Sequence, residues 1–305
     1  PRVLIMGIEA LDPSPQGIVS TSKARDTELK SEDYLKIVLD PFMDGRSGYI
    51  FAVNPGGARY DALVARRGEG EDPQWDAVWE AATARGPAGW SAEIRIPLQS
   101  LRFDASLRRW GFNVERRVER LQEVSRWASP IRAAKISQTS RAGILTELPV
   151  FDTGVGLTVR PAVVAGVEKE GEDGDWEGSF EPSLDVFQRL GQNVTAMATV
   201  NTDFAETEVD TRKTNLTRFP LFFPEKRTFF LEGSDIFDFG VGMASPYFSD
   251  VVPFFSRRIG LYEGESVPLN AGGKISGRMG NTNFGGLVTR TGSVDGLVDA
   301  ATMGA

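Results

Sequence analysis

Three consecutive charged residues, Glu225, Lys226 and Arg227, stand just before the phenylalanine pair Phe229 and Phe230. A second phenylalanine pair precedes them. Buried charges need partners, so a soluble core strand rarely holds three of them between aromatic pairs. A membrane interface or a barrel lumen suits both kinds of side chain, because aromatics then sit at the lipid boundary while charges face water. The segment therefore favours a membrane-associated setting.

The composition limits the chemistry that such charges can perform. The 305 residues include no histidine and no cysteine. This excludes a Ser-His-Asp triad, histidine general bases, thiolate nucleophiles, disulfides and cysteine-type zinc sites. Glycoside hydrolysis needs two carboxyl groups facing one sugar at about 5–9.5 Å. The obvious carboxylates, Glu93, Glu225 and Glu232, form no such pair in the sequence, so we predict no catalytic residue.

Charge and hydropathy exclude two further classes. A formal net charge of -8 without a basic patch argues against a nucleic-acid partner. No run of about 18 apolar residues occurs, so no transmembrane helix is predicted. The chain opens on Pro1 and Arg2 without a signal peptide, and it stops at Ala305 soon after a strand-like segment. We therefore expect both ends to be truncated from a longer protein.

Residues 1–145 show the alternation of a jelly-roll-like β-sandwich. Leu35, Ile37 and Leu39, for example, fall on one face of an extended segment. Turns rich in glycine, proline and aspartate separate such segments, as a sandwich requires. The clearest period-two segments are 33–40, 48–54, 89–96 and 109–117.

Trp75, Asp76, Trp79 and Trp127 are the candidates for carbohydrate binding. Sugar sites combine aromatic platforms with polar groups for the hydroxyls. On a strand, Trp75 and Trp79 share one face and Asp76 lies on the other. The competing interpretation is that both tryptophans fill the sandwich core, and the sequence favours it. The role of Trp127 stays open.

Asp40 and Asp44 are the candidate ligands for a cation, with Asp26 and Asp33 nearby in sequence. Carboxylate oxygens are what a hard cation such as Ca²⁺ prefers. The alternative is that these acids cap backbone groups in turns. We favour the turn interpretation, because their spacing matches no calcium loop. No other cofactor is predicted.

After a predicted linker at 146–155 the strands change character. The segments 156–168, 180–187 and 194–201 place apolar residues on one face and mostly polar ones on the other. Strands of about 10 residues with an apolar outside and a polar inside are typical of a transmembrane β-barrel. We therefore predict an all-β protein in which 156–305 begins an antiparallel, outer-membrane-type barrel. A second soluble sandwich is the alternative.

The charged, phenylalanine-rich segment is predicted to lie at the barrel mouth, after a short helix or turn at 211–219. Its charges would pair with lumen charges such as Asp203, Glu208 or the arginines, because buried charges need partners. A structural brace is favoured over a substrate gate. The residues assigned to this motif are Glu225, Lys226, Arg227, Phe229, Phe230, Glu232, Arg257 and Arg258.

Two groups of motifs carry a family resemblance. The run 89–97, with 101–103 and 110–113, resembles the late strands of family 9 carbohydrate-binding modules. The run 201–233, with 235–237 and 254–260, resembles Gram-negative surface proteins in which such a module precedes a C-terminal domain of unknown function, thought to be an outer-membrane barrel. Pro220 departs from the pattern, where a carboxylate is expected.

The resemblance implies a carbohydrate-binding outer-membrane protein that captures or takes up a glycan at the cell surface of a Gram-negative bacterium. Glycan and outer-membrane lipid would be its partners. Two other hypotheses stay open. One is a secreted or surface glycan-degrading enzyme, a glycoside hydrolase with a binding module. The other is a structural surface protein that does not bind sugar.

Overall fold

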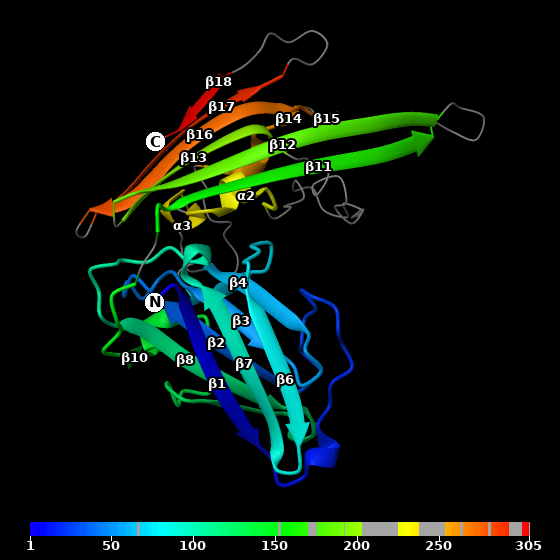
Figure 1. The fold of residues 1–305 in the computed structure, drawn as a ribbon, viewed down its shortest axis with the longest axis vertical. Helices are drawn as coiled ribbons and strands as arrows, with labels where there is room; N and C mark the ends of the chain where they lie inside the picture. Colours follow the sequence, from blue (N-terminus) through cyan, green and yellow to red (C-terminus); the bar gives the residue numbers. More distant parts are fainter. Residues whose placement is uncertain are drawn as a thin grey trace. The chain divides into compact units, whose positions relative to one another are not determined.

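The computed structural model divides into two compact units, Pro1–Gly154 and Val155–Ala305. Both are built from antiparallel β-sheets, and the described helices are short (Figure 1). The predicted all-β class is therefore confirmed. The structure describes residues 1–65, 68–151, 154–169, 176–191, 193–202, 225–237, 254–262, 265–279, 282–292 and 301–304.

The first unit is a sandwich of two sheets. In the three-stranded sheet, β7 lies between β1 and β6. The other sheet has the order β10-β8-β2-β3-β4-β5, with β9 paired to the same edge of β8 as β10. The strands are β1 (Val3–Leu11), β2 (Tyr34–Asp40), β3 (Tyr49–Val53), β4 (Arg59–Ala65), β5 (Gly70–Asp72), β6 (Glu80–Gly86), β7 (Gly89–Pro97), β8 (Trp110–Val118), β9 (Glu123–Arg126) and β10 (Gly143–Leu145).

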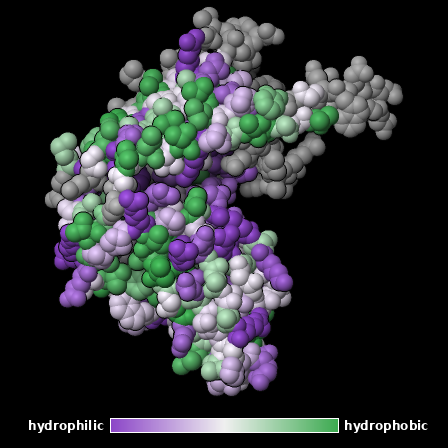
Figure 2. Space-filling model, viewed as in Figure 1, coloured by the Kyte–Doolittle hydropathy of each residue, from purple (hydrophilic) through white to green (hydrophobic). Residues whose placement is uncertain are grey.

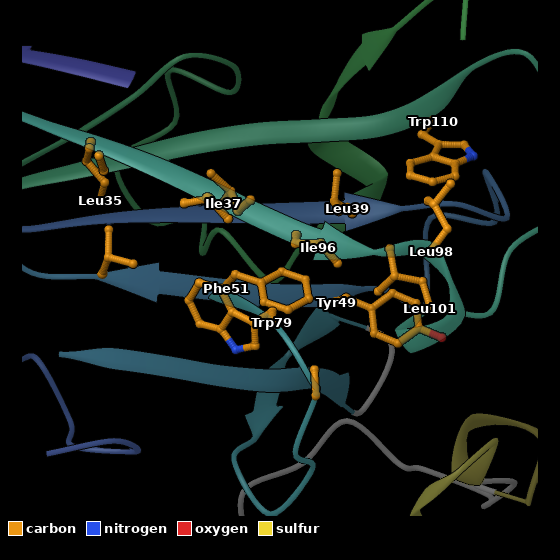
Figure 3. Close-up of a cluster of buried hydrophobic side chains, with 14 of the residues drawn as sticks. Leu35, Ile37, Leu39, Tyr49, Phe51, Trp79, Ile96, Leu98, Leu101 and Trp110 are labelled. Carbon is orange, nitrogen blue, oxygen red and sulfur yellow. The ribbon is translucent and has the colours of Figure 1, made fainter. Parts of the chain in front are cut away.

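The main core lies between these two sheets. Leu35, Ile37 and Leu39 of β2 belong to the same buried cluster as Ile94 and Ile96 of β7. Figure 3 shows the three β2 side chains together with Ile96. Burying each such side chain stabilises the fold by about 1.5–3 kcal/mol relative to leaving it in water. The predicted sandwich is therefore confirmed, with the alternating apolar residues turned inward.

The larger sheet is covered on its other face as well. Val38, Ile50 and Ala62 are fully buried there, in a second cluster that includes Leu29 and Ile136 from outside the sheet. Strands buried on both faces read as nearly continuous apolar runs. This explains why β2 and β3 contain so few polar residues.

The segment predicted as a linker, 146–155, mostly belongs to the first unit. Leu148 and Phe151 pack against the main core. The backbone N–H of Leu148 donates to the carbonyl of Arg108 at 3.0 Å, and the rings of Phe151 and Trp110 lie 5.1 Å apart. The boundary between the units follows at Gly154.

The second unit is a curved, barrel-like antiparallel sheet, as predicted. Its order is β11-β12-β13-β16-β17-β18, and its strands arch over α2 and α3 in Figure 1. None of the described helices is long and apolar enough to cross a membrane. The elements are β11 (Leu157–Lys169), β12 (Trp176–Leu190), β13 (Val194–Thr202), α2 (Thr228–Leu231), α3 (Ser234–Phe237), the 3-10 turn η6 (Ser256–Arg258), β14 (Leu261–Tyr262), β15 (Glu265–Ser266), β16 (Leu269–Met279), β17 (Thr282–Thr291) and β18 (Ala301–Gly304).

Glu32 ties the segment that precedes β2 to the rest of the sandwich. Its carboxylate accepts hydrogen bonds from the backbone and side chain of Thr21 and of Ser22, and from Asn54 Nδ2 at 2.7 Å. Burial opposes ionisation, but the hydrogen bonds from Ser22, Asn54 and Thr21 outweigh it and lower the pKa of Glu32 to about 2.

Glu32 should therefore make the first unit sensitive to acid. Because its pKa is lower in the folded chain, its contribution to the free energy of unfolding is present above pH 4.5 and is lost as the pH falls toward 2. The loss should be on the order of 3 kcal/mol. Urea unfolding of Glu32→Gln should show a deficit at pH 7 that shrinks below pH 3. The exposed Glu93→Gln serves as control, and an equal pH dependence in wild type and Glu32→Gln would contradict this role.

Candidate functional site

Two of the predicted sugar platforms are part of the sandwich core. Trp75 and Trp79 are each only 2% exposed. The ring of Trp75 lies 5.0 Å from that of Tyr49. The ring of Trp79 lies 5.1 Å from that of Phe51, and both of these rings are seen in Figure 3. A ring without an exposed face has nothing to offer a sugar. The assignment of these two residues to carbohydrate binding is therefore wrong, and the core interpretation holds.

Asp76 lies in a cluster of aspartates that forms salt bridges with Arg25. One carboxylate oxygen from each of Asp26, Asp61 and Asp76 lies within 4.8 Å of the others. Arg25 reaches Asp61 at 3.0 Å and Asp76 at 2.8 Å. Burial raises the pKa of Asp61, and burial together with Asp76 and Asp61 raises that of Asp26 to about 6. Arg25 thus supplies positive charge to this cluster.

Asp40 and Asp44 hold the turn between β2 and β3. Asp40 accepts hydrogen bonds from three backbone N–H groups, the shortest from Gly45 at 2.8 Å. Asp44 accepts from the backbone N–H and the hydroxyl of Ser47, both at 2.9 Å. Burial and the charge of Asp44 raise the pKa of Asp40 to about 6. This geometry matches the turn interpretation that the sequence favoured over calcium.

Trp127 is the one aromatic residue among the four sugar candidates that presents its ring to solvent. It is 62% exposed and lies 5.8 Å from the ring of Phe112. Gly143 of β10 makes room for it, because a Cβ there would come within 2.3 Å of the indole. Because Phe112 of β8 packs against the main core, the Trp127 ring lies on the core side of this sheet, at its edge.

A row of polar side chains that the sequence did not reveal crosses the other face of the larger sheet. The strand register places one residue of this row directly beside the next, on five neighbouring strands. We call it the polar row. In order across the sheet it runs through Arg126 (β9), Glu115 (β8), Lys36 (β2), the small apolar residue Ala52 (β3) and Tyr60 (β4), and it includes Tyr34 and Glu71, whose side chains bond to it.

Lys36 is the centre of the polar row. Its ammonium group bonds the carboxylate of Glu71 at 3.0 and 3.1 Å and lies over the rings of Tyr34 and Tyr60 at 5.6 and 5.2 Å. The Tyr60 hydroxyl donates to Glu71 at 2.9 Å. Burial, with Glu71 beside it, raises the pKa of Tyr60, so its phenol stays a hydrogen-bond donor. The side chains of Lys36 and Glu71 both reach solvent.

Glu115 continues this chemistry on β8. It accepts a hydrogen bond from the Tyr34 hydroxyl at 2.8 Å and from Arg126 Nε at 2.6 Å. The polar row thus brings together aromatic rings, carboxylates, an ammonium and a guanidinium on one face. The sequence signal was Lys36, a charge inside an otherwise apolar strand. Its neighbours could not be identified, because β2 and β8 are far apart in the chain.

In the second unit, the charged motif forms a closed network. Arg227 grips Glu225 with two hydrogen bonds of 2.8 Å and donates to the carbonyls of Ile259 at 2.7 Å and Ser256 at 2.9 Å. Although burial opposes ionisation, the hydrogen bonds and charge of Arg227 lower the pKa of Glu225. Arg227 is buried and lies 4.2 Å from the ring of Phe230. The network therefore braces α2 against η6.

The remaining motif residues surround this brace. Arg257 is buried and Arg258 is exposed, on η6. Lys226 and Glu232 are partly buried, and Glu232 closes the C-terminus of α2. The proposed lumen acids of 203–210, the predicted turn 211–219, Pro220, Phe222 and Phe223 lie outside the described residues. Within the described part, Glu225 of the same motif supplies a carboxylate partner of Arg227.

The aromatic residues of the motif dock α2 on one face of the curved sheet, which we call the inner face. Phe229 and Phe230 are buried with Met197, Leu269 and Leu287 of the sheet. The ring of Phe229 occupies the space that a side chain at Gly272 would take, because a Cβ there would lie 2.9 Å from the ring. We call this position the seat of Phe229. Gly285 leaves the same space for Phe237 of α3, at 2.8 Å. Lys274 then donates to the carbonyls of Phe229 and Glu232.

The opposite face of the sheet, its outer face, is apolar and open to solvent. Alternate residues of each long strand point there, and Val167 and Phe180 are both 70% exposed. Figure 2 shows hydrophobic side chains gathered on the surface of this unit. The outer face consists of Val159, Val163, Val167, Phe180, Leu184, Val200, Ile275 and Val288.

Comparison with known proteins gives one family. A model described as a domain of unknown function (DUF5916) matches residues 153–283. This match covers most of the curved sheet and the charged motif with α2 and α3. No curated protein and no solved structure matches the chain.

The packing of Phe229 on Gly272 can be tested by a substitution at Gly272, with the same substitution at Gly273 as control. Gly272→Ala would push a methyl group into Phe229 and Thr199, both 2.9 Å away. Overpacking of this kind costs about 1–3 kcal/mol of unfolding free energy. Gly273→Ala points to the outer face, where the nearest atom is 3.6 Å away, and should be nearly neutral. Urea-unfolding midpoints compare the two variants, and equal effects would refute this packing role of Gly272.

Proposed function

We propose that this protein is an outer-membrane protein of the Gram-negative cell surface, with the curved sheet in lipid and a carbohydrate-binding sandwich. The observation that carries the membrane part is the outer face. Exposed apolar patches of this extent on soluble proteins are binding surfaces or aggregation liabilities. A lipid bilayer fits such a sheet, because the strands of a transmembrane β-barrel turn apolar residues outward to lipid. Their inner face is polar or is covered by a loop or a helix.

Strand lengths support the same partner. The long strands contain 13 (β11), 15 (β12), 9 (β13), 11 (β16) and 10 (β17) residues. A tilted strand needs about 9–11 residues to cross the hydrocarbon core. A soluble sandwich would instead need a second layer on the outer face. Among the described residues, the helices and their phenylalanines pack on the inner face.

The carbohydrate part of the proposal is placed on the polar row. Sugar sites combine apolar rings with a few convergent polar groups. Lys36, Glu71 and Tyr60 offer both, and the side chains of Lys36 and Glu71 reach solvent beside the Tyr60 ring. The function that follows is capture or uptake of a glycan at the cell surface. Trp127 is the competing site, on the other side of the same sheet.

Two alanines of β11 give a matched test of the membrane placement. Ala165 points to the outer face and Ala162 to the inner face, and both are exposed. An arginine in lipid costs about 2–4 kcal/mol near the bilayer centre. Ala165→Arg should therefore reduce the fraction of protein recovered in the outer membrane, whereas Ala162→Arg should not. Equal recovery of both variants would reject the lipid placement.

The polar row can be tested by its central residue. We expect a glycan array to identify a ligand of the full chain, and calorimetry to give its Kd. Lys36→Met keeps the packing volume but removes the ammonium group, and should weaken binding at least tenfold, or about 1.4 kcal/mol. Arg95→Ala, an exposed residue of the smaller sheet, is the control. A silent array would favour a structural protein, and loss only in Trp127→Ala would move the site to that ring.

A further inference from the structure

A belt of polar positions crosses the inner face of the curved sheet at one height. The strand pairing places each of its members directly opposite the next, over five adjacent strands. We call it the polar belt; in order across the sheet it contains Arg160 (β11), Asp185 (β12), Thr199 (β13), Gly272 (β16) and Thr289 (β17).

Two of the five belt members, Asp185 and Thr199, are linked by a hydrogen bond. The Thr199 hydroxyl donates to Asp185 at 2.6 Å and shares a second hydrogen bond of 2.8 Å with Thr202. Arg160 lies 4.9 Å from the ring of Phe187, its neighbour on the inner face. The carboxylate of Asp185 is only partly exposed to solvent. The belt thus offers donors and acceptors beside an aromatic face.

Phe229 sits on the middle of the belt. Its ring occupies the space above Gly272, where the belt has no side chain, and touches the position that a Cβ would take. Lys274, the next inward residue of β16, holds the carbonyls of Phe229 and Glu232 and lies 5.2 Å from the Phe229 ring. The side chain of Phe229 therefore covers the middle of the belt, and Lys274 holds α2 in this position.

The next belt member after Gly272 is Thr289, whose hydroxyl group is buried. Thr289 is 1% exposed, and its Oγ1 has no hydrogen-bond partner among the described residues. Buried hydroxyls are nearly always paired, so each exception needs an explanation. A ligand that brings its own hydroxyl groups would pair with Thr289, Thr199 and Asp185. The ring of Phe187 supplies the apolar contact that saccharides also need.

We propose that the polar belt is a second carbohydrate site, for a neutral oligosaccharide, and that Phe229 closes it in this structure. The proposal rests on the proposed function in one respect, the nature of the solute that reaches this face. Opening requires α2 to leave its seat, which breaks the two hydrogen bonds of Lys274 and frees Thr289. The charged brace of Glu225 and Arg227 then acts as the fixed base of the moving segment.

The absence of cysteine in all 305 residues makes the belt accessible to a clean labelling test. Thr289→Cys in the full chain, in detergent micelles, should react slowly with a maleimide. Adding Phe229→Ala should raise the rate at least tenfold. Maltohexaose or cellohexaose should then slow the reaction at least fivefold. No rise would overturn the closure by Phe229, and a rise without protection by either sugar would overturn the carbohydrate assignment.

Three further variants keep the result interpretable. Val288→Cys, on the outer face beside Thr289, should label at the same rate with and without Phe229→Ala, and a change there would indicate unfolding. In that case Lys274→Met, which removes the hydrogen bonds to α2 but leaves Phe229, replaces Phe229→Ala and should give the same increase. Lys36→Met removes the proposed sandwich site. If the sugar still slows labelling in the Lys36→Met variant, the protection arises at the polar belt. If the protection disappears in that variant, the belt proposal is refuted.

Discussion

A β-sheet with an apolar face must cover that face, and the two units of this protein meet the requirement in opposite ways. In the sandwich, the apolar residues of two sheets turn toward each other and exclude water. In the second unit, the face that carries packed side chains is the inner one, where Phe229 and Phe237 fill the space left by Gly272 and Gly285. The apolar residues of the outer face are left for a partner outside the described chain, which we propose is lipid.

The inner face also shows how this protein handles buried charge. Removing a charge from water is costly unless partners replace the water. Arg227 meets this demand with Glu225 and two carbonyl groups, and Lys274 with the carbonyls at the end of α2. These groups are engaged in holding α2. The chemistry open to a ligand is therefore found beside the charged motif, at the hydroxyls and the carboxylate of the polar belt.

The sequence predicted the elements better than the sites. Period-two alternation in β2, β7 and β11 was enough to identify strands, and the same pattern separated the sandwich from the barrel-like sheet. The sites depend on strand pairing, which local pattern does not contain. Lys36 meets Glu115 only because β2 pairs with β8, and Thr199 meets Gly272 only because β13 pairs with β16. Trp75 and Trp79 show the converse, because a tryptophan pattern alone cannot distinguish a core from a platform.

The neighbourhood of β13 and β16 has a consequence for the order of folding. The pairs β11–β12, β12–β13 and β16–β17 join strands that are consecutive in the described chain, whereas pairing β13 with β16 must close a loop that contains α2, α3, β14 and β15. Closing a long loop costs entropy before its contacts form, so non-local pairing is slow. Phe229 lies inside that loop and packs on Gly272 in the strand that closes it. If α2 docks on β16 first, the loop that remains to be closed between β13 and β16 becomes shorter. This helix would then be part of the folding nucleus of the sheet whose inner face it covers.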